Sequence, residues 1–128
     1  MAFELNVKTG DITCRQGDSG DFTLSGIPDD REYTVYFAVR DNKNNIILEK
    51  TATLVEGDAL FEFTPEDTEN FIVPSGAKNK VYYWAVKLCY EPDNYEDTVV
   101  IGLNKTIADV NKLIAYPKVV EGTINANI

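Results

Sequence analysis

The sequence predicts an all-β fold, an antiparallel β-sandwich of seven to eight short strands with one short helix. Two segments, residues 32–40 and 81–90, carry most of this prediction. Both are rich in β-branched and aromatic residues and place a large residue at every second position, as strands with one buried face do. Along the rest of the chain, turn residues separate short alternating runs, which indicates the same class.

Three alternating runs precede the first aromatic strand, at residues 3–8, 12–16 and 21–25. Within 32–40 the odd positions are apolar, and we expect them to face the core: Tyr33, Val35, Phe37 and Val39. The Asn-rich stretch 41–45 predicts a hairpin connection. The return strand runs from 46 to about 55, and Lys50 interrupts its apolar face, which indicates a bulge or an edge position.

A short helix is predicted after the next strand, in which Ala59, Phe61 and Phe63 should face inward. Thr64 can cap the helix, Pro65 suits its first position, and the acidic residues 66–67 suit its positive end. Pro74 follows soon, so the helix must be brief.

The second aromatic strand, 81–90, should turn Tyr82, Trp84, Val86 and Leu88 toward the core. We expect an acidic loop at 91–97, a strand at 98–103 and a last strand within 106–116, which Pro117 ends. The predicted core brings residues from several strands together: Phe22, Val35, Phe37, Phe61, Phe63, Trp84 and Val86.

Length and composition predict one globular domain, at residues 1–117, followed by a polar, mobile tail at 118–128. The 128-residue chain is 44% hydrophobic and carries 12 basic and 21 acidic residues, for a net charge of −9. Such a surface repels nucleic-acid phosphates and anionic lipid, so neither is expected as a partner.

The N-terminal residues lack the basic and apolar regions of a secretory signal, and no apolar run is long enough to span a bilayer. We therefore expect the chain to be made and kept soluble in the cytoplasm. In that compartment the two cysteines, Cys14 and Cys89, should be free thiols. The strand register places Cys14 inward, beside Ile12, and Cys89 on the outer face.

No catalytic site, cofactor or metal is expected from the residues. The chain has no histidine, which removes the usual general base, zinc ligand and Ser-His-Asp arrangement. It also has no phosphate loop or dinucleotide fingerprint.

Adjacent carboxylates occur at 29–30, 66–67 and 96–97, and we interpret them as solvated turns and a helix start, not as a glycosidase pair. The Asp and Asn residues of 41–45 resemble the start of a calcium loop but lack its central glycine and closing glutamate, so hairpin chemistry explains them better.

The outer face of the two aromatic strands is unusually apolar. Five residues should point away from the core there: Tyr36, Ala38, Val81, Tyr83 and Ala85. A freely solvated face would hold Lys, Glu and Thr, so this set indicates coverage. Either another subunit covers the face, or the short helix and the C-terminal segment cover it within the domain.

The chain resembles the immunoglobulin-like β-sandwich domains of tailed-phage baseplate proteins. The most similar is the amino-terminal domain of the baseplate upper protein family, together with its prophage-encoded relatives in Gram-positive bacteria. The resemblance rests on residues 12–18 (ITCRQGD), 22–24, 33–39 (YTVYFAV), 63–68 (FTPEDT), 82–89 (YYWAVKLC), 96–98 and 116–122 (YPKVVEG). The spacing of cysteine and tryptophan that marks a true antibody domain is absent.

The resemblance implies a virion structural role, in which the domain docks into a tail baseplate, and it implies no catalytic residues. Family members usually continue into a helical or receptor-holding region, whereas this sequence stops at Ile128, so we expect a free-standing module or an accessory protein. Its expected partners are other tail proteins or a second copy of itself. The alternative function is a carbohydrate- or ligand-binding module, which would need several aromatic residues converging on one groove beside polar groups.

Overall fold

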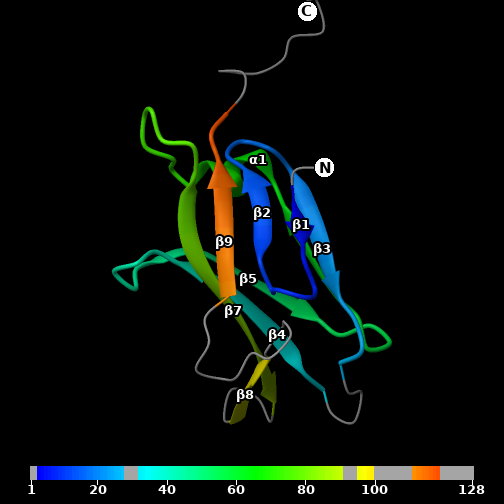
Figure 1. Ribbon diagram of the computed structural model, residues 1–128. Helices are drawn as coiled ribbons and strands as arrows, with labels where there is room; N and C mark the ends of the chain where they lie inside the picture. The colour runs from blue at the N-terminus through cyan, green and yellow to red at the C-terminus, as the bar shows by residue number, and fades with distance from the viewer. Residues whose placement is uncertain (1–2, 28–31, 91–94, 100–110, 119–128) are drawn as a thin grey trace, which may run out of the picture.

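The computed structural model describes residues 3–27, 32–90, 95–99 and 111–118, and within them it holds nine strands and one helix (Figure 1). Their bounds are β1 Glu4–Leu5, β2 Ile12–Arg15, β3 Gly20–Leu24, β4 Thr34–Arg40, β5 Ile46–Thr53, β6 Ala59–Phe63, α1 Pro65–Glu69, β7 Lys80–Tyr90, β8 Tyr95–Val99 and β9 Asn111–Tyr116.

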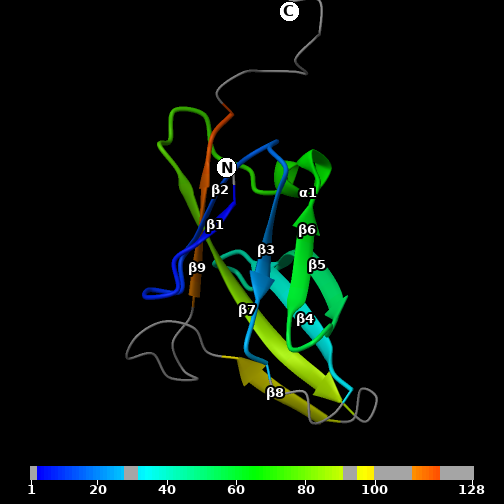
Figure 2. The ribbon, with the colours of Figure 1, turned by 90° about the vertical axis from the view of Figure 1, so that its right-hand side faces the viewer.

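The strands form two sheets that pack face to face. The large sheet has the order β1-β2-β9-β7-β4-β5, with β8 also paired to β7, and the small sheet pairs β3 with β6. Figure 2 shows β3 and β6 standing against one face of the large sheet. The prediction of an all-β sandwich with one short helix is confirmed, whereas the immunoglobulin-like connection pattern stays a prediction.

The core lies between the two sheets and contains every residue predicted for it. Phe22 of the small sheet contacts Phe37 and Trp84 of the large one, at centroid distances of 5.4 and 6.3 Å. The Trp84 indole is 2% exposed, and its Nε1–H donates to the Gly10 carbonyl at 3.0 Å. This bond satisfies the one polar group that the indole takes into the core.

Strand β7 organises the large sheet because it has different partners along its two edges. One edge pairs with β4 from Tyr83 to Cys89. The other edge pairs first with β9, up to Trp84, and then with β8, from Val86 onward. The predicted inner positions of both aromatic strands are all buried, so the alternation assigned their faces correctly.

One strand pair departs from the antiparallel pairing that the sequence predicts. β2 and β9 run parallel, with Ile12 opposite Leu113 and Arg15 opposite Tyr116. They come from opposite ends of the described chain, so no hairpin sets their relative direction. Alternation also reads the same in either direction along a strand, so the sequence pattern carries no information on this point.

Two predicted strand positions need correction. The run 3–8 contributes only β1, because the Asn6 side chain accepts from the backbone N–H of Lys8 and of Thr9, at 3.0 and 3.3 Å, and starts a turn. The strand expected at 98–103 is β8, Tyr95–Val99, which takes in the end of the predicted acidic loop. β8 pairs with β7 in an antiparallel ladder, and Glu96 forms an ion pair of 2.7 Å with Lys87 of β7, so an acidic residue suits this strand.

Other predicted boundaries agree with the structure. β9 ends at Tyr116, before Pro117, and β5 ends the large sheet in the described strands, so Lys50 does occupy an edge strand. A register shift lies between the pairs Val39–Leu48 and Arg40–Ile46, so the extra residue, Ile47, belongs to β5 itself. Residues 100–110 and 119–128, which include parts of two predicted strands and most of the predicted tail, lie outside the described residues.

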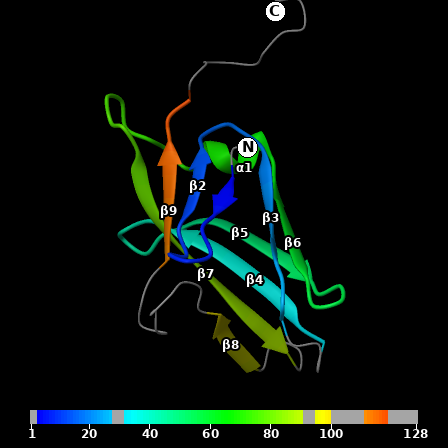
Figure 3. The same cartoon turned by 45° about the vertical axis from the view of Figure 1, so that its right-hand side comes forward.

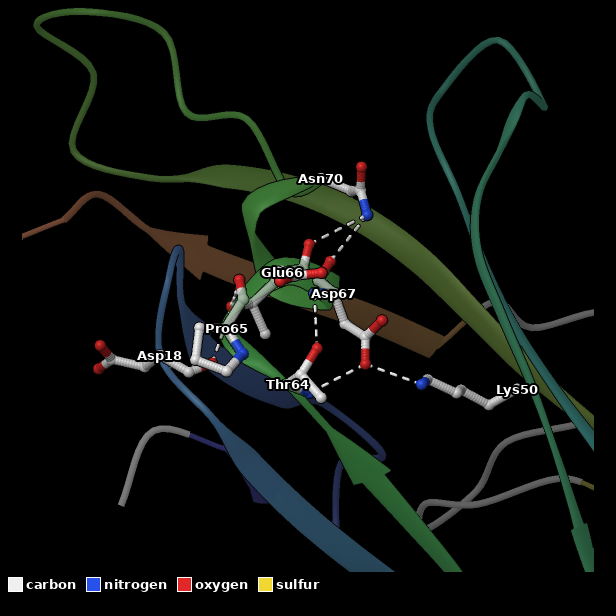
Figure 4. A network of polar contacts seen from close by, with 8 residues as sticks. Asp18, Lys50, Thr64, Pro65, Glu66, Asp67 and Asn70 are labelled. Atoms are coloured by element: carbon white, nitrogen blue, oxygen red, sulfur yellow. Dashed lines mark hydrogen bonds and ion pairs between the residues drawn. The ribbon is translucent and has the colours of Figure 1, made fainter. Parts of the chain in front are cut away.

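Helix α1 begins where the sequence predicts and is held by several polar contacts (Figure 4). Thr64 and Asp67 form a capping box, in which each side chain accepts from the backbone N–H of the other residue. Lys50 of β5 pairs with the Asp67 carboxylate at 2.7 Å, which ties the edge strand to the helix. Burial opposes ionisation of Asp67, but the Lys50 ammonium and the Thr64 N–H hold its pKa below the ordinary value.

The helix sits at one end of the sandwich, where β6 ends (Figure 3). Thr68 is fully buried, and its hydroxyl donates toward the Asp18 carbonyl at 2.7 Å. Lys118 pairs with Glu69, which joins the residue after Pro117 to the same helix. In the described part of the chain, no helix has the length and apolar character needed to cross a membrane.

The two cysteines are free thiols, as predicted. Cys14 is buried on the inner face of β2, and Cys89 is half-buried on the outer face of β7. Burial, with a smaller contribution from the nearby Asp18 charge, raises the pKa of Cys14 from 9.0 to about 12. The Cys14 thiol is therefore protonated at neutral pH and poorly reactive.

Candidate functional site

The five outer-face residues lie on the two central strands of the large sheet. Tyr36 and Ala38 belong to β4, and Val81, Tyr83 and Ala85 belong to β7. Among the described residues, neither the short helix nor the last strand covers this face, and residues 119–128 of the C-terminal segment lie outside the described residues. Helix α1 sits at the end of the small sheet, and β9 lies within the large sheet beside β7.

The register of β4 and β7 builds a depression in the middle of this face. Ala38 is directly opposite Ala85, and the small methyl groups of this pair form a floor. Larger residues flank the floor on both sides, where Tyr36 is opposite Lys87 and Arg40 is opposite Tyr83. Each side therefore has one tyrosine and one cation. We call these six residues the alanine notch.

The notch lies in a concavity of about 550 Å³. Its floor is sheltered on one strand and open on the other, because Ala38 is 5% exposed whereas Ala85 is an exposed residue. The β4–β5 hairpin forms part of the rim, through Asp41, Asn42 and Asn44. The concavity thus combines methyl groups and aromatic rings with amide, carboxylate and cationic groups.

On one side of the notch, Tyr36 is held in place by charged neighbours. Its hydroxyl donates to the Glu49 carboxylate of β5, and the Lys87 ammonium lies 5.2 Å from the centroid of its ring. Burial, followed by the hydrogen bond to Glu49, raises the pKa of Tyr36 to about 12. The phenol therefore stays protonated at neutral pH, and Lys87 is itself paired with Glu96.

On the other side, Tyr83 lies between two cations of neighbouring strands. The register places Arg40 of β4 on one side of it and Lys112 of β9 on the other. Arg40 donates through Nη1 to the Asn44 side-chain oxygen at 3.1 Å, which links the notch to the hairpin. Tyr83 is half-buried, and within the described residues its hydroxyl makes no hydrogen bond, so this group can bind a ligand.

The hairpin is stiffened by Asp41. Its carboxylate accepts from the backbone N–H groups of Lys43 and Asn45, both at 2.9 Å, and from the Asn45 side chain at 3.1 Å. These bonds, led by that of the Asn45 backbone, hold the pKa of Asp41 below its ordinary value. Turn chemistry accounts for both carboxylate oxygens, and the described residues contain no cluster of three or more acidic, histidine or cysteine side chains that could hold a metal.

Val81 lies apart from the other four outer-face residues. Its partner across the strands is Ile114 of β9, and it does not line the concavity. Conversely, the polar members of the site were absent from the predicted set. Arg40 shares the strand face of Tyr36, and Lys87 shares the face of Tyr83, so alternation alone could have found both. The hairpin residues could be added only once the strand pairing was established.

Comparison with known proteins adds no family to this description. No family model matches the chain, and no curated protein is significantly similar to it.

Proposed function

We propose that this protein is a non-catalytic structural or assembly protein of a phage or prophage tail baseplate and acts as a docking module. The resemblance of its sequence to baseplate domains supports the setting. The observation that carries the docking role is the outer face of β4 and β7, where two half-buried tyrosines and an arginine surround a concave floor of two alanines. The partner is another tail protein or a second copy of this chain.

The composition of this face suits association between proteins. Tyrosine and arginine are enriched at interfaces and carry much of their binding energy, because they combine large contact areas with directed polar groups. The alanine floor leaves room for a side chain of the partner. Tyr36 and Lys87 are already held by Glu49 and Glu96, so little side-chain entropy is lost when a partner binds.

A second candidate is a carbohydrate-binding module. Such a module requires aromatic residues that converge on one groove beside polar groups. Tyr36 and Tyr83 line the same concavity as Asp41, Asn42 and Asn44. This meeting of aromatic and polar side chains is the observation that supports the second candidate.

The docking role is tested by placing charge on the outer face. In the variant Tyr36→Lys with Tyr83→Lys, two cations replace the aromatic contact surface, so we expect association to fall at least tenfold. Light scattering and sedimentation of the protein, alone and with candidate tail proteins, measure this change.

The matched control is Leu60→Lys with Ile72→Lys. It adds the same charge at two exposed apolar residues outside this face, 51% and 64% exposed, and it should leave association unchanged. Equal association of both double variants and the unmodified chain would contradict the docking role.

A further inference from the structure

We infer that the alanine notch is a binding subsite for one neutral pyranose ring, and that the β4–β5 hairpin is its specificity element. The inference rests on the second candidate function and deepens it, and it names a ligand class that the docking role does not need.

The dimensions of the notch suit one sugar ring. A concavity of about 550 Å³ falls inside the range of roughly 300–1,000 Å³ that is typical of small-molecule sites. On β4, the residues that flank the floor, Tyr36 and Arg40, are four positions apart, which is about 13 Å along a strand. The two alanine methyl groups lie between them, so a flat ring can reach the floor, whereas a larger side chain at either alanine would fill the space.

The walls offer the surfaces that a pyranose needs. A pyranose presents C–H groups on its faces and hydroxyls around its rim. An aromatic face carries negative charge density and attracts the weakly positive C–H groups, while the phenol hydroxyl remains available as donor and acceptor. Tyr83 is suited to this role because it is half-buried and its hydroxyl has no partner within the described residues. Tyr36 forms the opposite wall and is positioned by Glu49.

The charges around the notch favour a neutral ligand. Lys87 is paired with Glu96 at 2.7 Å, Glu49 accepts from Tyr36, and the positive Arg40 is followed directly by the negative Asp41. An anionic ligand would have to compete with Glu96 for Lys87 and approach a chain with a net charge of −9. A neutral polyol gains hydrogen bonds without disturbing these pairs.

The hairpin supplies groups that match sugar hydroxyls. Asn42 and Asn44 line the concavity, and an amide carries both donors and an acceptor, as neighbouring hydroxyls do. Asn44 adopts a left-handed backbone conformation with φ of 67°, which closes the hairpin tightly, and Arg40 holds its side-chain oxygen. The hairpin is therefore rigid enough to distinguish one hydroxyl configuration from another.

The test is an NMR titration of the isotope-labelled protein with a panel of neutral methyl glycosides and their oligosaccharides, namely glucose, galactose, mannose and N-acetylglucosamine. Glucuronic acid and an acidic peptide complete the panel. We expect saturable shifts for at least one neutral saccharide, confined to β4, β7 and the hairpin. Tyr83→Ala should weaken this binding about tenfold, the loss of one aromatic contact, and Ala85→Leu should abolish it.

The matched control is Tyr95→Ala, which removes an exposed tyrosine that stacks on Tyr90 and lies outside the notch; it should bind as the unmodified chain does. Well-dispersed spectra of each variant show that it is folded.

Three outcomes would each overturn the inference: no saturable shift with any neutral saccharide, a response to the anionic probes alone, or binding that survives Ala85→Leu. Loss of tail-protein association in the Tyr36 and Tyr83 double variant without any saccharide binding would overturn the sugar subsite and leave the docking role standing. Saccharide binding by the unmodified chain, together with unchanged tail-protein association in the double variant, would support the sugar subsite and contradict the docking role.

Discussion

The two faces of β4 and β7 are built from alternate residues of the same strands, yet they differ in kind. The inner face carries Val35, Phe37 and Val39, each fully buried in the core, where Phe37 contacts the small sheet. The outer face carries two alanines directly opposite each other between tyrosines and cations. Large side chains fill the space on the inner face, and small ones leave it open on the outer face. Apolar composition therefore corresponds to packed core on one face and to an open concavity on the other.

The largest contrast between the faces should come from truncating neighbouring aromatic residues. Trp84→Ala should lower the free energy of unfolding by roughly 3–5 kcal/mol, because it leaves a cavity beside Phe37 and removes the bond to Gly10. Tyr83→Ala, one position away on the outer face, should cost less than about 1 kcal/mol. Urea unfolding followed by circular dichroism measures both. Equal losses for the two variants would mean that the strand has no distinct inner face.

Enlarging an alanine on each face gives a second contrast. Ala115 of β9 is fully buried in the core, so Ala115→Leu should overpack it and cost roughly 1–3 kcal/mol. Ala85→Leu projects into the open notch, and its effect on stability should stay within about 0.5 kcal/mol. Thermal unfolding of the two variants separates these outcomes. A large loss for Ala85→Leu would show that the notch is filled in the native protein.

The buried thiol of the inner face should make stability depend on pH in alkaline solution. Unfolded Cys14 loses its proton near pH 9, whereas folded Cys14 keeps it up to about pH 12. Its contribution to stability is therefore complete below pH 9 and is lost as pH rises toward 12. The unmodified chain should lose about 1.4 kcal/mol more per pH unit in this window than Cys14→Ala does, as measured by urea unfolding. Equal slopes would contradict the burial of this thiol.

Thiol labelling gives the corresponding kinetic test at neutral pH. Native Cys14 should react far more slowly than Cys89, because Cys14 is 2% exposed and its pKa is raised. Both should react once the chain is unfolded without reductant. Absence of free thiols after unfolding would show a disulfide and overturn the assigned positions of both cysteines.

Local signals in the sequence account for much of the fold. Alternation places Phe37 and Trp84 inward and Tyr36 and Tyr83 outward, because successive side chains of a strand point to opposite faces. Thr64 and its acidic neighbours mark the start of α1, because capping depends on residues three apart. The start of β8 was mispredicted, since the acidic segment suits a strand when it pairs with β7, where the Glu96 carboxylate reaches the Lys87 ammonium.

The order of residues along the chain is enough to set the fold class, the face of each central-strand residue and the start of the helix, because each depends on near neighbours. Three further relations arise only in the folded domain: Ala38 meets Ala85, Arg40 and Lys87 flank them, and β2 runs parallel to β9. These relations depend on pairing between distant strands. That pairing is set by the hydrogen bonds and buried surface of the whole domain, and the two-residue period of a strand is the same for every possible partner.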